Sequence, residues 1–79
     1  GTKGGMEGVL DAVLAKNPDA RICISAIALE TLSAAVAALT AHGLVVEVTQ
    51  ISVSRTKAAG SLHLLMANNP VFLITGART

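Results

Sequence analysis

The segment that most constrains the fold runs from Arg21 to Gly43, where an apolar run leads into a helical pattern. Residues 22–27 are apolar except for Ser25 and are rich in β-branched side chains. A short run of this kind is typical of a strand that is covered on both faces. Apolar side chains then recur at helical spacing, at Leu32, Ala35, Val36 and Leu39. The segment therefore predicts a buried strand followed by an amphipathic helix, which is half of a βαβ unit.

Both ends of this helix carry suitable residues. Glu30 lies in the expected first turn and His42 in the last, where their charges complement the helix dipole. Gly43 can adopt the left-handed conformation that ends many helices. We therefore expect the helix to end at His42.

An earlier helix precedes the buried strand. Its apolar residues follow the spacing i, i+3, i+4, i+7 and i+8, at Met6, Val9, Leu10, Val13 and Leu14. Asn17-Pro18 ends it, because proline disfavours helical backbone at the residue before it. A glycine-rich loop, Gly1 to Gly5, leads into this helix.

The second half of the chain predicts strands. Alternating apolar residues from Leu44 predict a strand, and the change of parity at Ile51 predicts either a bulge near residues 49–51 or an exit from the sheet there. Residues 54–61 are expected to form a polar loop, and residues 62–67 a short strand. After a turn at residues 68–70, a closing strand is expected from Val71 to Thr75, ended by Gly76.

The order of these elements predicts an α/β fold. A strand beginning at Ile22 and another beginning at Leu44, joined by a helix, should be parallel with a right-handed crossover. The closing strand, reached through a turn, should be antiparallel. Both helices would then cover one face of the sheet. Burying one Val, Leu or Ile side chain is worth about 1.5–3 kcal/mol, so we expect a further segment or another subunit to cover the other face.

Composition excludes several partners. The net charge of +1 provides no basic surface for nucleic acid, and Phe72 is the sole aromatic side chain. Residues 22–46 carry only one charge, Glu30, but their polar interruptions and many alanines argue against a membrane span. Cys23 is the single cysteine, so no internal disulfide can form, and we interpret it as an inert core thiol in a reducing cytoplasm.

The chain is unusually apolar for its size. Hydrophobic residues make up 52% of its 79 residues and charged residues 14%. Because a small domain has a large surface to keep polar, we expect residues 1–79 to be a partial domain of a longer protein.

Several segments together resemble the decarboxylating precorrin-6Y methyltransferases of cobalamin biosynthesis. The most specific are Leu29-Glu30-Thr31-Leu32, Val53-Ser54-Arg55 and Asn69-Pro70-Val71, in this order and spacing. One departure is Ser25-Ala26-Ile27-Ala28, where relatives often carry Asn-Ala-x-Thr. The resemblance extends from the glycine-rich loop to Gly76.

The resemblance implies the C-terminal half of a Rossmann-like methyltransferase fold, with parallel strands and an antiparallel closing strand. It further implies S-adenosylmethionine as cofactor, a corrin precursor as substrate, and coupled decarboxylation of an acetate side chain. Members of the family are cytoplasmic oligomers, typically tetramers, or are fused to a second methyltransferase. The parts of the family that bind the cofactor have no counterpart in this sequence, so we expect the isolated chain to be inactive.

Five residues are candidate substrate contacts: Gly4, Gly5, Ser25, Glu30 and Arg55. The two glycines precede a helix whose backbone N–H groups could receive an anion. Ser25 and Glu30 lie at the carboxyl end of the buried strand, where open α/β sheets bind ligands. Arg55 could bind a substrate carboxylate through two hydrogen bonds. Each also has a structural interpretation: a flexible turn, a helix-dipole residue or a solvated charge.

No catalytic residue is assigned, and no metal site is expected, because Cys23, His42 and His63 lack the spacing of metal ligands. The alternative hypothesis is a small α/β regulatory or oligomerisation module without catalysis.

Overall fold

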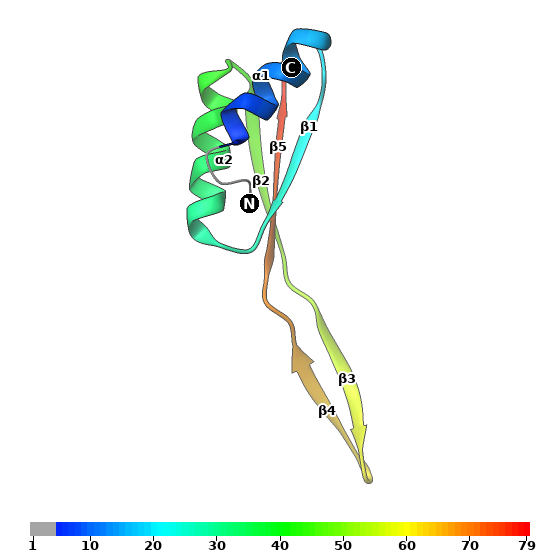
Figure 1. Cartoon of the computed structure of the whole chain (residues 1–79). Coiled ribbons are helices and arrows are strands. Elements are labelled where there is room, and N and C mark those ends of the chain that lie inside the picture. The colour runs from blue at the N-terminus through cyan, green and yellow to red at the C-terminus, as the bar shows by residue number, and fades with distance from the viewer. Residues whose placement is uncertain (1–4) are drawn as a thin grey trace.

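The computed structural model describes residues 5–79 as an α/β body with a projecting hairpin (Figure 1). The elements in these residues are α1 (Met6–Lys16), β1 (Ile22–Ala26), α2 (Leu29–Ala41), β2 (Val45–Ile51), β3 (Ser54–Ala59), β4 (Leu62–Ala67) and β5 (Val71–Ala77). The molecule measures 57 × 26 × 18 Å, and its length comes from the hairpin. Gly1 to Gly4, the first part of the expected loop, lie outside the described residues.

The sheet of the body has the strand order β1-β5-β2, and both of its strand pairings are antiparallel. Ile74 in the middle of β5 pairs with Ile24 of β1 on one side and with Val48 of β2 on the other. The expected antiparallel closing strand is confirmed, and no two neighbouring strands of this sheet in residues 5–79 are parallel. β1 and β2 do run in the same direction, but β5 lies between them, because the chain turns back through the hairpin and inserts its last strand there.

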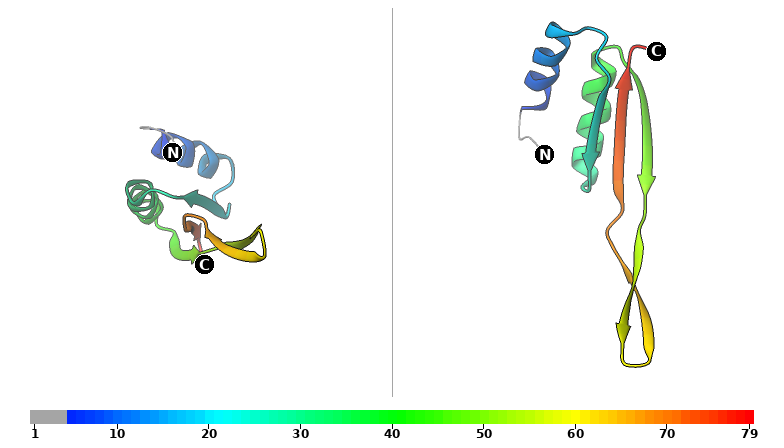
Figure 2. Two further views of the ribbon diagram at one scale, coloured as in Figure 1. Left: turned by 90° about the horizontal axis from the view of Figure 1, so that it is seen from below. Right: turned by 90° about the vertical axis from the view of Figure 1, so that its right-hand side faces the viewer.

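Helix α2 packs on one face of this sheet. Ala35 and Leu39 of α2 and Ile74 of β5 have no exposed surface. Further buried apolar residues complete this core: Leu10, Ala26, Ala38 and Leu44. Helix α1 lies beside α2, toward the β1 edge of the sheet, as both views in Figure 2 show. The backbone of α1 approaches α2 more closely than it approaches any other helix or strand in residues 5–79.

The helix ends follow the sequence prediction. Gly43 adopts a positive φ of 73°, and its N–H donates to the Thr40 carbonyl at 2.9 Å. The N–H of Leu44 then donates to the Leu39 carbonyl at 3.2 Å. These bonds satisfy the carbonyl groups that the end of a helix leaves free. The chain is thereby turned directly into β2.

The opposite face of the sheet is bare in the part of the chain that the structure describes. Burial alternates along β1: Ile22 and Ile24 face α2 and are half-buried, whereas Cys23 and Ser25 are exposed. The expectation that Cys23 is a core thiol is therefore wrong for these residues, because its side chain lies on the face without a helix. The prediction that residues 1–79 leave one face uncovered is confirmed for residues 5–79.

The expected polar loop at residues 54–61 is wrong, because these residues form β3 and the turn of a β3–β4 hairpin. Gly60 at the turn has a φ of 63°, a conformation that glycine adopts without strain. The short strand expected at residues 62–67 is confirmed as β4. Because every residue of β3 and β4 is exposed, the hairpin shows no buried apolar pattern from which to predict β3.

The bulge expected near residues 49–51 is absent from the described chain. β2 pairs with β5 in an unbroken register from Val45↔Ala77 to Ile51↔Val71. The second possibility, an exit from the sheet, is what the structure shows, directly after Ile51. Neither α1 nor α2, the helices of the described part, is long and apolar enough to cross a membrane.

Candidate functional site: a hollow at the end of β1

Two adjoining hollows lie around the carboxyl end of β1. The first, here called the α1–β1 hollow, is about 370 Å³ and lies between α1 and β1. Its lining residues are Met6, Val9, Leu10, Val13, Ile22, Cys23, Ile24, Ser25 and Thr31. The second, here called the loop hollow, is about 410 Å³ and is formed mainly by the β1–α2 connection, with Val71 of β5. Ser25 and Thr31 line both, so they are the residues with hydroxyl side chains that the two hollows share.

Ser25 lies where the sequence placed it, near the end of β1. Its neighbours along β1 alternate between the α2 face and the bare face, and its exposed side chain belongs to the bare face. Its hydroxyl is therefore open to a ligand that approaches this edge of the sheet.

Glu30 and Gly5 lie close to this edge but line neither hollow. Glu30 is exposed in the first turn of α2. Gly5 caps the N-terminus of α1, and its carbonyl accepts a hydrogen bond of 2.9 Å from the N–H of Val9. Gly4 lies outside the described residues.

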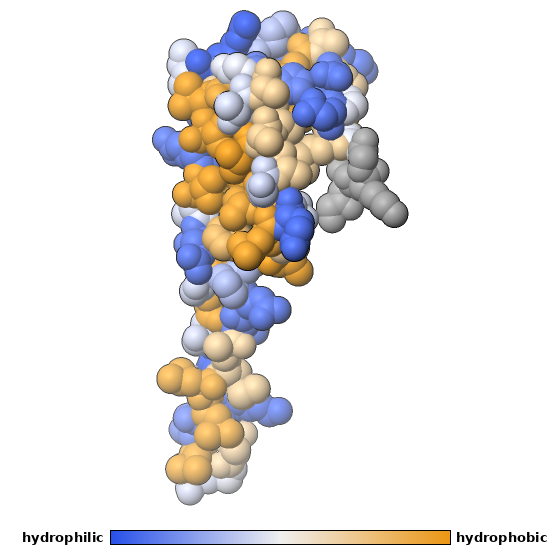
Figure 3. Space-filling view, turned by 90° about the vertical axis from the view of Figure 1, so that its left-hand side faces the viewer, coloured by the Kyte–Doolittle hydropathy of each residue, from blue (hydrophilic) through white to orange (hydrophobic). Residues whose placement is uncertain are grey.

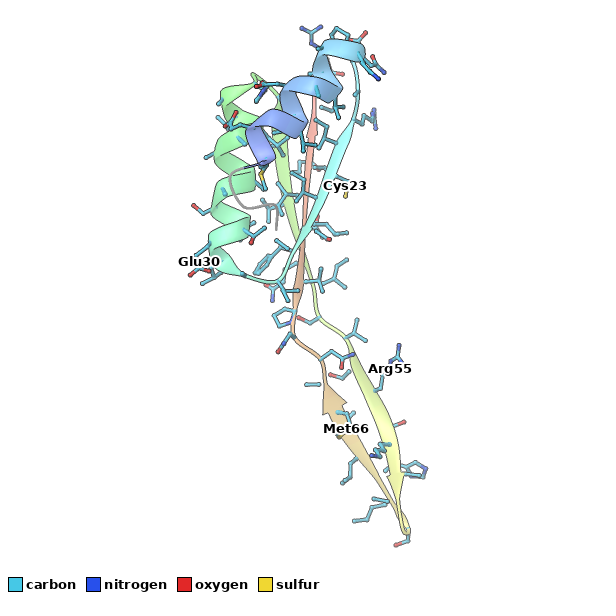
Figure 4. All side chains as sticks on the ribbon, in the orientation of Figure 1. Cys23, Glu30, Arg55 and Met66 are labelled. Atoms are coloured by element: carbon cyan, nitrogen blue, oxygen red, sulfur yellow. The ribbon has the colours of Figure 1, made fainter. Side chains whose placement is uncertain are left out.

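Arg55 lies away from the other candidates. It is exposed on β3, directly opposite Met66 of β4, and the hairpin carries it away from the body that holds Glu30 (Figure 4). The structure therefore places Ser25 at the hollows and does not bring Arg55 to them within one chain.

Thr31 is a residue that sequence analysis missed as a site candidate. It is half-buried in the first turn of α2 and lines both hollows beside Ser25. The available signal was its position: a hydroxyl residue in the first turn of a helix that follows a strand lies at the carboxyl edge of the sheet.

The side chains that line the two hollows are suited to binding a ligand and not to acid–base or nucleophilic catalysis. In residues 5–79, no carboxylate or histidine lines either hollow, and no buried side-chain polar atom lacks a partner. Hydroxyl groups donate hydrogen bonds to carboxylates or carbonyls. They do not act as nucleophiles without an adjacent base. The described residues thus form an apolar hollow with two hydroxyl groups at its edge.

A second polar cluster lies at the opposite end of α2. The ring of His42 approaches Asp11 Oδ1 with Nε2 at 2.7 Å, and the Ala38 carbonyl with Nδ1 at 2.8 Å. Glu7 Oε2 lies 3.9 Å from Nδ1. The hydrogen bond to the Ala38 carbonyl, followed by that to Asp11, raises the pKa of His42 above its ordinary value. Sequence analysis placed His42 at a helix end correctly but could not foresee its acidic neighbours, which come from α1.

This arrangement of helices and strands is that of solved methyltransferases of the precorrin class. A precorrin-6Y C5,15-methyltransferase from Geobacter metallireducens superimposes on all of this chain with a TM-score of 0.86 at 35% identity, and 41% of its length is covered. A precorrin-8w decarboxylase from Methanobacterium thermoautotrophicum gives 0.84 at 31% identity over 94% of this chain and 40% of its own.

The sequence comparisons agree with the structural ones. The family profile of the precorrin methyltransferase domain matches residues 1–78, so the chain belongs to this family. A probable cobalt-precorrin-6B C(15)-methyltransferase (decarboxylating) from Pyrobaculum calidifontis is 39% identical over 74 residues. That match covers 91% of this chain but only 38% of the relative. The resemblance inferred from the sequence is confirmed, and the chain spans about two fifths of the length of these relatives.

The α1–β1 hollow and the loop hollow do not fit S-adenosylmethionine on their own. The α1–β1 hollow is mainly apolar, and in residues 5–79 it lacks an acidic side chain that could bind a ribose or face a sulfonium. The outer edge of β1 is also unpaired within these residues. Neither hollow therefore forms a complete cofactor site within residues 5–79.

Proposed function

We propose that this chain is the C-terminal part of an S-adenosylmethionine-dependent methyltransferase that acts on a corrin precursor in cobalamin biosynthesis. The same reaction would include decarboxylation of an acetate side chain of that precursor. The single observation that carries the proposal is the match of the precorrin methyltransferase profile to residues 1–78. The relatives named as decarboxylating or as decarboxylases support the second half of the reaction.

We assign substrate contact to the edge at the end of β1. A corrin precursor carries several carboxylates, which accept hydrogen bonds from hydroxyl groups and from the free N–H groups at a helix N-terminus. Ser25 and Thr31 supply the hydroxyl groups there, and Gly4 and Gly5 precede the N-terminus of α1. Glu30, an acceptor, would meet N–H groups of the ring, because its charge repels the carboxylates.

Arg55 has a different part in this proposal. Because β3 carries it away from the hollows, it would bind a carboxylate of a substrate molecule held by another subunit. Its guanidinium group suits a carboxylate through paired hydrogen bonds. This contact requires an assembly of several chains.

We propose that the protein is a homo-oligomer, a tetramer by its resemblance, and that the hairpin takes part in the assembly. Figure 3 shows apolar side chains along the hairpin. Leu62 is 62% exposed and Leu65 is 77% exposed. An isolated two-stranded hairpin is only marginally stable in water. Covering these side chains with a second hairpin would stabilise both. Fusion to a second methyltransferase domain is compatible with this arrangement.

The cofactor and the cellular location follow from the same proposal. We assign S-adenosylmethionine binding to a segment of the protein other than residues 5–79, and the chain's own residues then line the substrate side. A cytoplasmic location is supported by the biosynthetic role and by the single cysteine, Cys23, which needs no oxidising compartment.

The experiment uses the full-length protein that contains this chain. It is incubated with a corrin precursor and with S-adenosylmethionine carrying an isotope in the methyl group. Mass spectrometry of the product should show both the labelled methyl group and the loss of carbon dioxide. A product with neither change would contradict the proposal and leave the non-catalytic module as the better hypothesis.

A further inference from the structure

A histidine joins the two helices of the body through two hydrogen bonds. His42 lies at the C-terminal end of α2, with its side chain 16% exposed. Its Nδ1 is 2.8 Å from the carbonyl oxygen of Ala38, on its own helix. Its Nε2 is 2.7 Å from Oδ1 of Asp11, on α1. Both partner atoms are acceptors, because one is a carbonyl and the other a carboxylate oxygen.

The number of N–H groups that the imidazole ring needs follows from these two acceptors. A neutral imidazole has one N–H, so it can donate to only one of two acceptors and must turn a lone pair toward the other. An imidazolium has two N–H groups and satisfies both at once. Both distances are below 3 Å, and only the charged ring can donate a hydrogen bond at both.

We propose that His42 is a proton-operated clasp that holds α1 against α2 and so controls the shape of the α1–β1 hollow. The charged groups that act on the ring are the carboxylates of Asp11 and Glu7, both on α1. Helix α2, which His42 caps at its C-terminus, contributes the Ala38 carbonyl. When the ring loses its second proton, either the bond to Asp11 or the bond to Ala38 becomes a contact between two lone pairs.

The clasp matters because apolar packing holds only part of α1, through Leu10 and the partly buried Met6 and Leu14. Leu10 is the one residue of α1 that is fully buried, whereas Val9 and Val13 are 53% and 41% exposed. The same helix contributes Met6, Val9, Leu10 and Val13 to the wall of the α1–β1 hollow. A change in how α1 sits on α2 therefore changes the hollow directly. His42 lies away from Ser25 and Thr31, so the clasp does not depend on the proposed reaction.

The direction of the pH effect follows from linkage. The pKa of His42 is raised above its ordinary value, which is about 6.5, chiefly by the Ala38 carbonyl and then by Asp11. The stabilisation is therefore fully present below pH of about 6.5, and it is lost as the pH rises through the higher pKa of the folded protein. The body should be tighter in mildly acidic than in alkaline solution.

A metal ion is the competing occupant of the three side chains Glu7, Asp11 and His42. The 2.7 Å between Nε2 and Oδ1 is a hydrogen-bond length, so a metal ion could enter only if the two atoms moved apart. Two ligands of one tetrahedral Zn²⁺, each about 2.0–2.2 Å from the metal, would lie roughly 3.3 Å or more apart.

The test is hydrogen exchange of α1 in the full-length protein at pH values from about 6 to about 9, around the ordinary histidine pKa. After correction for intrinsic exchange, we expect α1 amides to exchange several-fold faster above the pKa of His42 than below it. Asp11→Asn, which keeps the size of the side chain and removes its charge, should flatten this dependence. His63→Gln, at the other histidine of the chain, should leave it unchanged. The β3–β4 hairpin serves as an internal reference.

Three results would overturn the clasp. The first is α1 exchange in the wild type that does not change with pH. The second is a pH dependence of α1 exchange in Asp11→Asn that equals that of the wild type. The third is protection of α1 by added Zn²⁺ in the wild type but not in His42→Gln, which would make the cluster a metal site. As a measurement that does not depend on any variant folding, the ring signals of His42 in the wild type should titrate above the ordinary value. Titration at or below it would contradict the proposal.

Discussion

Gly76 of β5 lies directly against Leu39 of α2, with no space for a side chain between them. A Cβ atom on Gly76 would come within 3.0 Å of Leu39 Cδ2 and 3.2 Å of Leu44 Cδ1. Leu39 is completely buried, so it has little room to move. The close approach of helix and sheet at this point depends on the missing side chain of glycine.

Gly76→Ala should therefore destabilise the protein. Overpacking of a dense core costs about 1–3 kcal/mol, and we expect the free energy of unfolding to fall by about that amount. Chemical denaturation of the full-length protein measures it. The matched control is Gly8→Ala on the surface of α1, where a Cβ meets no atom of the described residues within 4 Å. It should raise stability by about 0.5–1 kcal/mol, because alanine favours a helix over glycine. Equal effects of the two changes would contradict this account.

Leu39→Ala should be the most damaging truncation on α2. Removing a buried leucine side chain costs about 2–5 kcal/mol, because the cavity left behind does not close completely. The control is Leu29→Ala on the same helix, which is 69% exposed. It should change the free energy of unfolding by less than about 0.5 kcal/mol. A loss at Leu29 as large as that at Leu39 would mean that another segment covers the start of α2.

Gly43→Ala should also lower stability, for a different reason. The position has a φ of 73°, and a left-handed conformation costs a residue with a Cβ about 1–2 kcal/mol. Within residues 5–79, no neighbouring atom lies within 4 Å of a Cβ there, so the cost arises from the backbone alone. Gly43→Asn should cost less, because asparagine tolerates this conformation better. Thermal unfolding of the two variants checks the ranking, and an asparagine variant less stable than the alanine variant would refute it.

Because its apolar side chains are exposed, charged substitutions in the β3–β4 hairpin should change the oligomeric state. Leu64→Asp and Leu65→Asp together place charges on both of its faces, where the wild-type side chains are 46% and 77% exposed. We expect sedimentation to show smaller species, because charges oppose burial of the hairpin in an interface. Ala34→Lys, at an exposed position of α2, is the control and should leave the assembly unchanged. If the hairpin variant sediments like the wild type, assembly uses another surface.

Removing the Ser25 hydroxyl should weaken substrate binding if the proposed contact exists. Ser25→Ala should lower kcat/KM of the full-length enzyme for its corrin substrate by about tenfold, the effect of losing a hydrogen bond of about 1.5 kcal/mol to a charged group. If the hydroxyl binds substrate as proposed, the change should lie mainly in KM, because no basic side chain of residues 5–79 lines the hollows beside it. Ser33→Ala, exposed on α2 and outside both hollows, is the control. Unchanged kinetics in Ser25→Ala would remove Ser25 from the substrate site.

The helices and most of the strands could be predicted from the sequence, because their signals are local. The spacing of apolar residues from Met6 to Leu14 and from Leu32 to Leu39 is a property of each segment alone, and so is the left-handed glycine at position 43. The β3 strand could not be predicted. With both of its faces exposed, its residues lack the alternation that packing imposes on a strand.

The sequence by itself determined which segments are helical, where α2 ends, the family of the chain, and the presence of a sheet with one bare face. Only the tertiary structure decided that β5 separates β1 from β2, that Cys23 is exposed, and that Thr31 joins Ser25 at the hollows while Arg55 does not. It also brought Asp11 to His42, which lies 31 residues away in the sequence. The physical reason is that local patterns report which face of a segment is apolar. Strand order and contacts between distant side chains depend on how the whole chain shares one core.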